Sequence, residues 1–148
     1  MRLAFATAFA LLAGCTTGGM EVQPSSSAHG GTLRLVRSTS SKPTFALMNS
    51  GSSPLAYNHW FSLGPEPVAY CRGADRQIRF CSLRIMLGDD DQPYTHEGYI
   101  QPGESVSFQA APAKDEQVGV HLWVEGQEEA LWLDGWTPNK SLERTRDR

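Results

Sequence analysis

The chain has 148 residues, a formal net charge of −3 at pH 7 and 40% hydrophobic residues. This length is enough for one domain with its own hydrophobic core. The acidic balance argues against a general nucleic-acid-binding protein, because such proteins carry a clustered positive surface. The charge is also uneven: residues 16–138 hold 8 Lys or Arg against 14 Asp or Glu, whereas residues 139–148 hold 4 against 2.

A short apolar run opens the chain. Residues 3–12 (LAFATAFALL) carry no charge and follow Arg2. The run is too short to cross a bilayer as a helix, which takes about 20 apolar residues. A charged start, a short apolar run and small residues after it are typical of a secretory signal peptide. We therefore predict that residues 1–14 are a signal peptide rather than a buried core helix.

The residues that end this run have a recognisable pattern. The tetrapeptide LAGC, residues 12–15, resembles the lipobox of bacterial lipoproteins at all four positions. The resemblance implies that the Cys15 thiol carries a diacylglyceryl group, that the chain is cut before Cys15 and that the new amino terminus is acylated. Two or more acyl chains anchor a protein stably, whereas one anchors it marginally. Thr16 stands where Asp retains family members in the inner membrane, which favours an outer-membrane anchor facing the periplasm.

The segments on either side of the expected domain have biased compositions. Residues 15–31 comprise Cys15 and a stretch rich in Gly, Ser and Pro, without periodicity, which predicts a flexible linker. Residues 137–148 are polar and charged, and we expect a tail that is disordered or forms a frayed helix turn. A partner-binding tail is the alternative. The folded domain then spans residues 32–136.

Lipidation of Cys15 leaves two cysteines, Cys71 and Cys81. Disulfides persist in exported proteins, and an even remainder fits a disulfide. We therefore predict a Cys71–Cys81 disulfide. A zinc site is disfavoured because no CxxC or closely spaced His pair accompanies these cysteines. A redox role is disfavoured because their spacing is far from CxxC.

The rest of the chain consists of short period-2 runs separated by Gly, Pro, Asn and Asp, with no sustained 3.6-residue period. This pattern predicts an all-β sandwich of about seven strands. The period-2 and apolar runs cover residues 32–38, 44–49, 54–62, 68–71, 77–87, 98–100, 105–110, 117–124 and 130–136.

Two parts of this pattern resemble small bacterial immunoglobulin-like domains. One is FALMNSGSSPL, residues 45–55, and the other is a PGE turn followed by SVSF, residues 105–108. In such domains the Asn ends one strand and the Pro starts the next. The resemblance implies an immunoglobulin-like fold over residues 32–136 and no activity.

The last two expected strands suggest a binding face. A hairpin centred on residues 127–128 would place Leu122, Val124, Leu131 and Leu133 toward the core, because strand side chains alternate. Its other face would carry Trp123 opposite Trp132 and His121 opposite Asp134. An exposed aromatic pair can stack a sugar ring or anchor a protein. The alternative is a cross-strand pair covered by the protein's own loops or second sheet. We expect Trp60 in the core.

Two charged clusters have ordinary explanations. Asp89, Asp90 and Asp91 lack the alternation and the following Gly of an EF-hand loop, so we expect a solvated turn. Basic residues surround the expected disulfide. They either bind an anionic lipid or glycan, or lie on a solvent-exposed hairpin edge where their charges block pairing with another strand. They are Arg72, Arg76, Arg79 and Arg84.

The sequence offers no catalytic motif. It contains no GxSxG, HExxH or phosphate-binding loop. Its four histidines, His29, His59, His96 and His121, are scattered. We therefore expect no enzyme, cofactor or metal site, but a lipid-anchored envelope protein that serves as a binding or accessory module for another envelope protein. The alternatives are a glycan or peptidoglycan binder and an inhibitor of an envelope enzyme.

Overall fold

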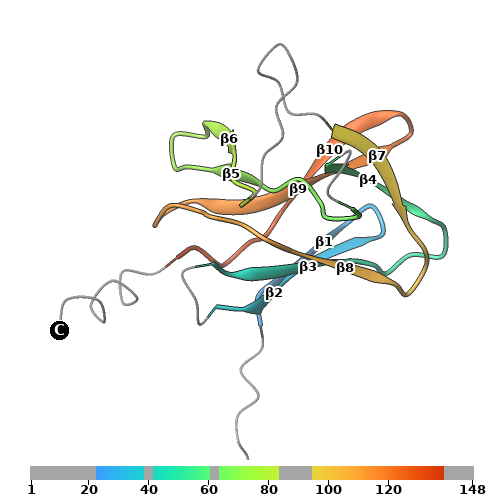
Figure 1. Ribbon diagram of the computed structural model, residues 1–148, viewed down its shortest axis with the longest axis horizontal. Helices are drawn as coiled ribbons and strands as arrows, with labels where there is room; N and C mark the ends of the chain where they lie inside the picture. The colour runs from blue at the N-terminus through green and yellow to red at the C-terminus, as the bar shows by residue number, and fades with distance from the viewer. Residues whose placement is uncertain (1–22, 39–41, 61–63, 84–94, 139–148) are drawn as a thin grey trace, which may run out of the picture.

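The computed structural model describes residues 23–38, 42–60, 64–83 and 95–138. Within these residues the chain forms ten β-strands and no helix, arranged as two antiparallel sheets that pack face to face (Figure 1). This confirms the predicted all-β, immunoglobulin-like sandwich, with more strands than the expected seven. Among the described residues, no helix is long and apolar enough to span a membrane.

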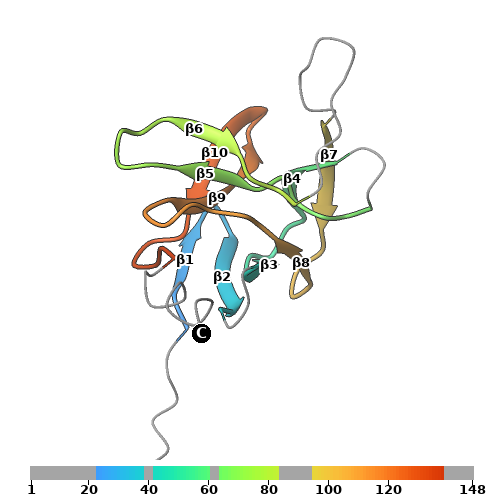
Figure 2. The same ribbon diagram turned by 60° about the vertical axis from the view of Figure 1, so that its left-hand side comes forward.

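The first sheet has four strands in the order β1-β2-β3-β8. Their bounds are Ser25–Ala28 for β1, Gly31–Arg37 for β2, Thr44–Asn49 for β3 and Ser105–Gln109 for β8. In Figure 2 the strands β1, β2 and β3 form the lower layer of the sandwich.

Strand β1 lies inside the segment predicted as linker, so the sheet begins earlier than residue 32. It pairs with β2 across a tight turn at His29 and Gly30, which both have positive φ (51° and 81°). Two such residues suit the two-residue hairpin turns whose twist matches that of the strands. The segment SSSA has none of the β-branched or aromatic residues that mark a strand, so its pairing with β2 was not visible in the sequence.

The second sheet has six strands with β9 at its centre. Their bounds are Leu55–Trp60 for β4, Tyr70–Arg72 for β5, Ile78–Phe80 for β6, Thr95–Ile100 for β7, Gln117–Val124 for β9 and Gln127–Trp132 for β10. Strand β10 pairs along one edge of β9, and β5 and β4 pair with successive parts of the other edge. Strands β6 and β7 extend the sheet beyond β5 and β4.

Hydrophobic side chains cover both faces of the second sheet. The main core lies between the sheets and includes Phe45, which stacks on Phe108 with ring centroids 5.5 Å apart. A second cluster contains Trp60, Val68 and Tyr70, with Phe80 and Trp132 packed against it. Trp60 is fully buried, as predicted, but in this second cluster. In a two-layer sandwich the outer face of a sheet is usually polar, so the second cluster sets this face apart.

Asn49 explains where β3 ends. Its side chain is 1% exposed, and its Nδ2 donates to the carbonyl oxygens of Ser53 (2.7 Å) and Ile100 (2.8 Å). Its Oδ1 accepts a hydrogen bond from the Gly51 amide at 2.9 Å. The amide therefore holds the turn that leads to β4, which begins directly after Pro54. This agrees with the strand-ending Asn expected from the sequence.

Candidate functional site

The β9–β10 hairpin has a different register from the predicted one. Its turn is formed by Glu125 and Gly126, both with positive φ, so that Val124 pairs with Gln127 instead of Leu131. The predicted partner of every residue in the hairpin is therefore wrong by four positions. Because this shift is an even number of residues, each side chain keeps its predicted face. The core face is formed by Leu122, Val124, Leu131 and Leu133.

The two tryptophans of the hairpin are consequently not opposite each other. Trp123 pairs with Glu128, and Trp132 pairs with Gly119. Both indoles are half-buried. A Cβ on Gly119 would lie 2.4 Å from Cε3 of Trp132, so the indole packs directly on the glycine backbone.

Asn58 connects Trp123 to its surroundings. It is 4% exposed, and its Oδ1 accepts a hydrogen bond from Nε1 of Trp123 at 3.0 Å. Its Nδ2 donates to the carboxylate of Glu128 and lies 3.5 Å from the hydroxyl oxygen of Tyr70. Asn58 was not predicted as a site residue. Its only signal in the sequence was that a polar residue interrupts an aromatic-rich strand.

His121 stacks on Tyr70 on the same face, and its Nδ1 lies 3.6 Å from a carboxylate oxygen of Glu128. Burial of the imidazole lowers the pKa of His121, while the nearby Glu128 carboxylate acts in the opposite direction. Burial likewise raises the pKa of Tyr70. These shifts favour neutral side chains at the centre of the face.

Trp132 also contacts Arg72, whose guanidinium carbon lies 4.3 Å from the indole centroid. Nη2 of Arg72 also donates to Oε1 of Gln117 at 2.6 Å. Nε2 of Gln117 in turn donates to Oδ1 of Asp134 at 2.7 Å. Asp134 is therefore joined to Gln117, beyond the end of β10, rather than to His121.

A row of side chains crosses the outer face at the other end of β9. Trp123 pairs with Ala56 of β4, and Ala56 pairs with Tyr99 of β7. Adjacent strands lie about 4.8 Å apart, so the Trp123 and Tyr99 backbones are about 10 Å apart. Tyr99 is 61% exposed, the highest value among the large hydrophobic residues that the structure describes as exposed. The small Ala56 side chain thus lies between two aromatic rings.

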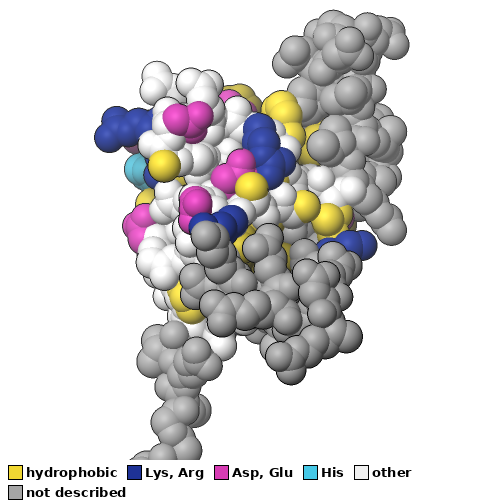
Figure 3. Space-filling model, turned by 90° about the vertical axis from the view of Figure 1, so that its left-hand side faces the viewer, with side chains coloured by type: hydrophobic (Ala, Val, Ile, Leu, Met, Phe, Trp, Pro, Cys, Tyr) yellow, Lys and Arg dark blue, Asp and Glu magenta, His cyan; other side chains and the backbone are white. Residues whose placement is uncertain are grey.

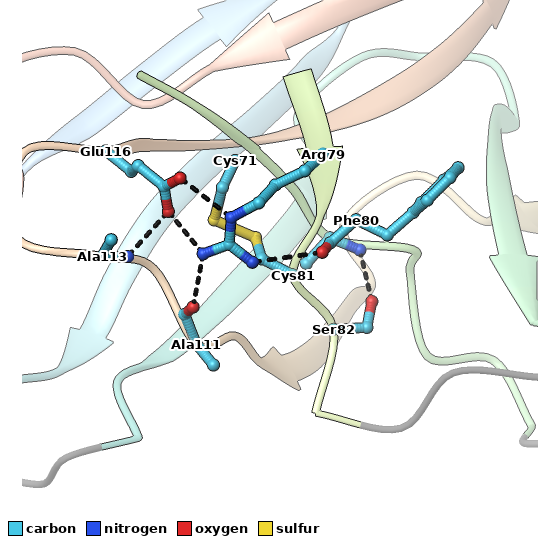
Figure 4. The surroundings of a disulfide bond; sticks show 9 residues. Cys71, Arg79, Phe80, Cys81, Ser82, Ala111, Ala113 and Glu116 are labelled. Atoms are coloured by element: carbon cyan, nitrogen blue, oxygen red, sulfur yellow. Dashed lines mark hydrogen bonds and ion pairs between the residues drawn. A yellow bond between two sulfur atoms is a disulfide. The ribbon is translucent and has the colours of Figure 1, made fainter. Parts of the chain in front are cut away.

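The predicted disulfide between Cys71 and Cys81 is present, with a Cα–Cα distance of 5.7 Å (Figure 4). It joins β5 to the residue directly after β6 and lies in the main core. Beside it, Ala111 donates its amide to the Cys81 carbonyl at 2.8 Å, which ties this hairpin to the chain that follows β8. The disulfide therefore stabilises a junction between the two sheets.

Arg79 is the basic residue whose hydrogen bonds reach this junction. Its guanidinium binds both carboxylate oxygens of Glu116, at 2.8 and 2.5 Å, and donates to the carbonyl of Ala111 at 3.0 Å (Figure 4). Hydrogen bonds from Arg79 lower the pKa of Glu116. Arg72 and Arg79 thus have protein partners, whereas Arg84 lies outside the described residues. Figure 3 shows Lys and Arg side chains interspersed with Asp and Glu at this end of the molecule.

A hollow of about 340 Å³ lies near Arg72. Its lining residues include an aromatic residue and charged residues of both signs. The lining residues are Arg72, Gly73, Ala74, Asp115, Gln117, Gly135, Trp136 and Thr137.

Outside the described residues lie the predicted signal peptide, Cys15, Asp89, Asp90, Asp91 and residues 139–148 of the expected tail. Within the described part of the chain, no three His, Cys, Asp or Glu side chains come together as a metal site.

A scan against known family models and a search of curated proteins found no match to this chain.

Proposed function

We propose that this chain is a lipid-anchored envelope protein whose β-sandwich binds another envelope protein. The lipobox-like residues 12–15 support the anchor. The buried disulfide supports export, because disulfides persist in oxidising compartments. Export and anchoring would place the domain at a membrane surface in the periplasm, on the outer membrane.

The position of β1 limits how far the domain extends from such an anchor. Only residues 16–24 separate Cys15 from β1. Fully extended, this segment spans at most about 30 Å, at about 3.3–3.6 Å per residue. As a flexible chain it spans about 16 Å in root-mean-square terms. A domain held this close to the lipid acts on partners at the membrane.

The row of Trp123, Ala56 and Tyr99 is the observation that carries the binding role. The backbone and Asn58 hold the Trp123 indole in place, and Tyr99 presents its ring to solvent. Fixed, partly exposed aromatic side chains are the residues that most often anchor a protein partner. An incoming side chain placed over Ala56 would contact both rings, because the Ala56 side chain between them is short.

The binding role is tested by crosslinking in cells, followed by pull-down of the tagged, detergent-extracted chain and mass spectrometry. We expect one stoichiometric partner. Tyr99→Ala should reduce its recovery at least tenfold, because the exposed ring contributes to binding and little to folding. Val36→Ala is the matched control, since Val36 is 47% exposed on the first sheet. Equal recovery with both variants, or no partner above background, would contradict the proposal.

The hollow beside Arg72 favours a second candidate function, the binding of a glycan or peptidoglycan. It brings the Trp136 indole together with Arg72 and Asp115, and sugar sites combine an aromatic platform with polar groups. Sedimentation with purified cell-wall material tests this function. Loss of sedimentation in Asp115→Ala, with Tyr99→Ala unaffected, would favour the glycan over the protein partner.

A further inference from the structure

The fold brings together two histidines that lie far apart in the sequence. His59 of β4 pairs directly with His96 of β7, with ring centroids 6.2 Å apart and ring planes at 82°. Two imidazoles that share one metal ion hold their ring centres about 5 to 6 Å apart, since each ligating nitrogen lies about 2.0–2.1 Å from the metal. Binding of one ion by both rings would require a side-chain rotation that turns a nitrogen of each ring toward the same point.

The pair lies at the rim of the core. On this face of the sheet the paired residues Leu55 and Ile100 are buried, whereas His59 is half-buried and His96 is exposed. The core therefore ends before the histidine pair, and solvent reaches it. A metal ion can enter such a position without any opening of the fold.

The hydrogen bonds of His59 fix its tautomer. Its Nδ1 lies 3.0 Å from the carbonyl oxygen of Trp60 and 3.1 Å from that of Gly64. Both oxygens are acceptors only, so Nδ1 carries the proton and Nε2 keeps its lone pair. Metal-binding histidines usually donate their other ring N–H to a carbonyl or carboxylate in this way. These two hydrogen bonds thus leave the Nε2 lone pair of His59 for a metal ion.

Gly98 makes room for this ring orientation. It lies two residues after His96, so the two share a face of β7. A Cβ at position 98 would lie 2.7 Å from Cδ2 of His59 and 3.2 Å from Nε2. Any side chain there would push the imidazole away from its two carbonyl partners.

We propose that His59 and His96 bind one divalent transition-metal ion, with water in the remaining coordination positions. Imidazole ligands suit Zn²⁺, Ni²⁺ and Cu²⁺, and Cu²⁺ binds most tightly to a given set of nitrogen ligands. Two protein ligands give a weak, exchangeable site, in contrast to the closed four-ligand sites of structural zinc. The site does not depend on the proposed anchor or on the aromatic row.

Isothermal titration of the full chain with Zn²⁺ at pH 7.5 tests this site, in a Cys15→Ser background so that no free thiol competes. We expect one ion per chain, at least tenfold weaker binding in His59→Ala and in His96→Gln, and unchanged binding in the control His29→Ala. Cu²⁺ should bind more tightly than Zn²⁺.

His96 is exposed, so His96→Gln tests the site even if His59→Ala weakens the fold. NMR spectra of the histidine ring protons provide a second measurement, in which Zn²⁺ should shift the signals of His59 and His96 and leave those of His29 in place. Equal Zn²⁺ binding by the parent chain and His96→Gln would overturn the proposal. Absence of binding by the parent chain at Zn²⁺ concentrations up to about 1 mM would overturn it as well.

Discussion

The imidazole of His121 stacks on the phenol ring of Tyr70, with centroids 3.8 Å apart and planes within 9° of parallel. The contact joins β9 to β5 on the outer face of the second sheet. Tyr70 is 7% exposed and belongs to the second hydrophobic cluster. The stack therefore extends that cluster toward Glu128 and Asn58, and makes the outer face a packed layer.

The stack predicts a pH dependence of stability. Burial lowers the pKa of His121 below its usual value of 6.5, so the unfolded chain takes up a proton first as the pH falls. The stabilising contribution is present above pH 6.5 and is lost as the pH falls through the pKa of the folded state. We expect the melting temperature to decrease from pH 7 toward pH 5. His121→Phe, which keeps an aromatic stack and does not titrate, should remove this part of the slope. An identical slope in His121→Phe would contradict the assignment.

The Arg79–Glu116 pair predicts a modest coupling energy. Arg79 is half exposed (47%) and water screens the pair, so a double-mutant cycle with Arg79→Ala and Glu116→Ala should give about 0.5–1 kcal/mol. Because Arg79 lowers the pKa of Glu116, the coupling is present above about pH 4.5 and is lost as the pH falls through the lowered value. The control is Lys114–Asp115, an exposed pair at 3.9 Å, which should give no measurable coupling. Equal coupling in both cycles would contradict a specific role for Arg79.

The disulfide predicts a larger loss. Cys71 and Cys81 are ten positions apart, and closing a loop of this length stabilises a protein by about 2–3 kcal/mol in the chain-entropy model. The double variant Cys71→Ala, Cys81→Ala should therefore unfold at lower urea concentration. Reductant should lower the midpoint of the parent chain and leave that of the double variant unchanged. An unchanged midpoint in the reduced parent would refute the prediction.

The contact of Gly119 with Trp132 predicts that Gly119→Ala is destabilising. The added Cβ would lie 2.4 Å from the indole and 2.9 Å from the carbonyl oxygen of Leu131. Overpacking of this kind costs about 1–3 kcal/mol in free energy of unfolding. In a Trp132→Ala background the cost should shrink, because only the carbonyl clash remains. The same cost in both backgrounds would show that the indole is not the obstacle.

Strands whose sequences alternate clearly could be predicted to the residue. The segments TFALMN and QVGVHLWV match β3 and β9 at both ends. The faces of the last hairpin were also predictable, but its register was not, because it depends on Glu125 and Gly126 forming a two-residue turn with positive φ. The Glu-Gly pair is a weaker signal than the Asn-Gly or Asp-Gly pairs preferred in such turns.

The candidate site was less predictable than the strands. The disulfide followed from counting cysteines, whereas the hydrogen bond from Trp123 to Asn58 joins residues 65 positions apart. Contacts at this separation depend on which strands are neighbours, and period-2 patterns do not specify the order of strands in a sheet. The same reason explains why the sequence did not predict the His59–His96 pair or the row of Trp123, Ala56 and Tyr99.

The proposed anchor at Cys15 underlies the envelope role, and intact mass spectrometry of the chain extracted from membranes with detergent tests it most directly. We predict a chain that begins at Cys15 and carries the added mass of a diacylglyceryl group and an amino-terminal acyl chain. The variant Cys15→Ser should lack this mass and should not be cut before position 15. A mature chain that retains Met1, or one that carries no lipid on Cys15, would contradict the account.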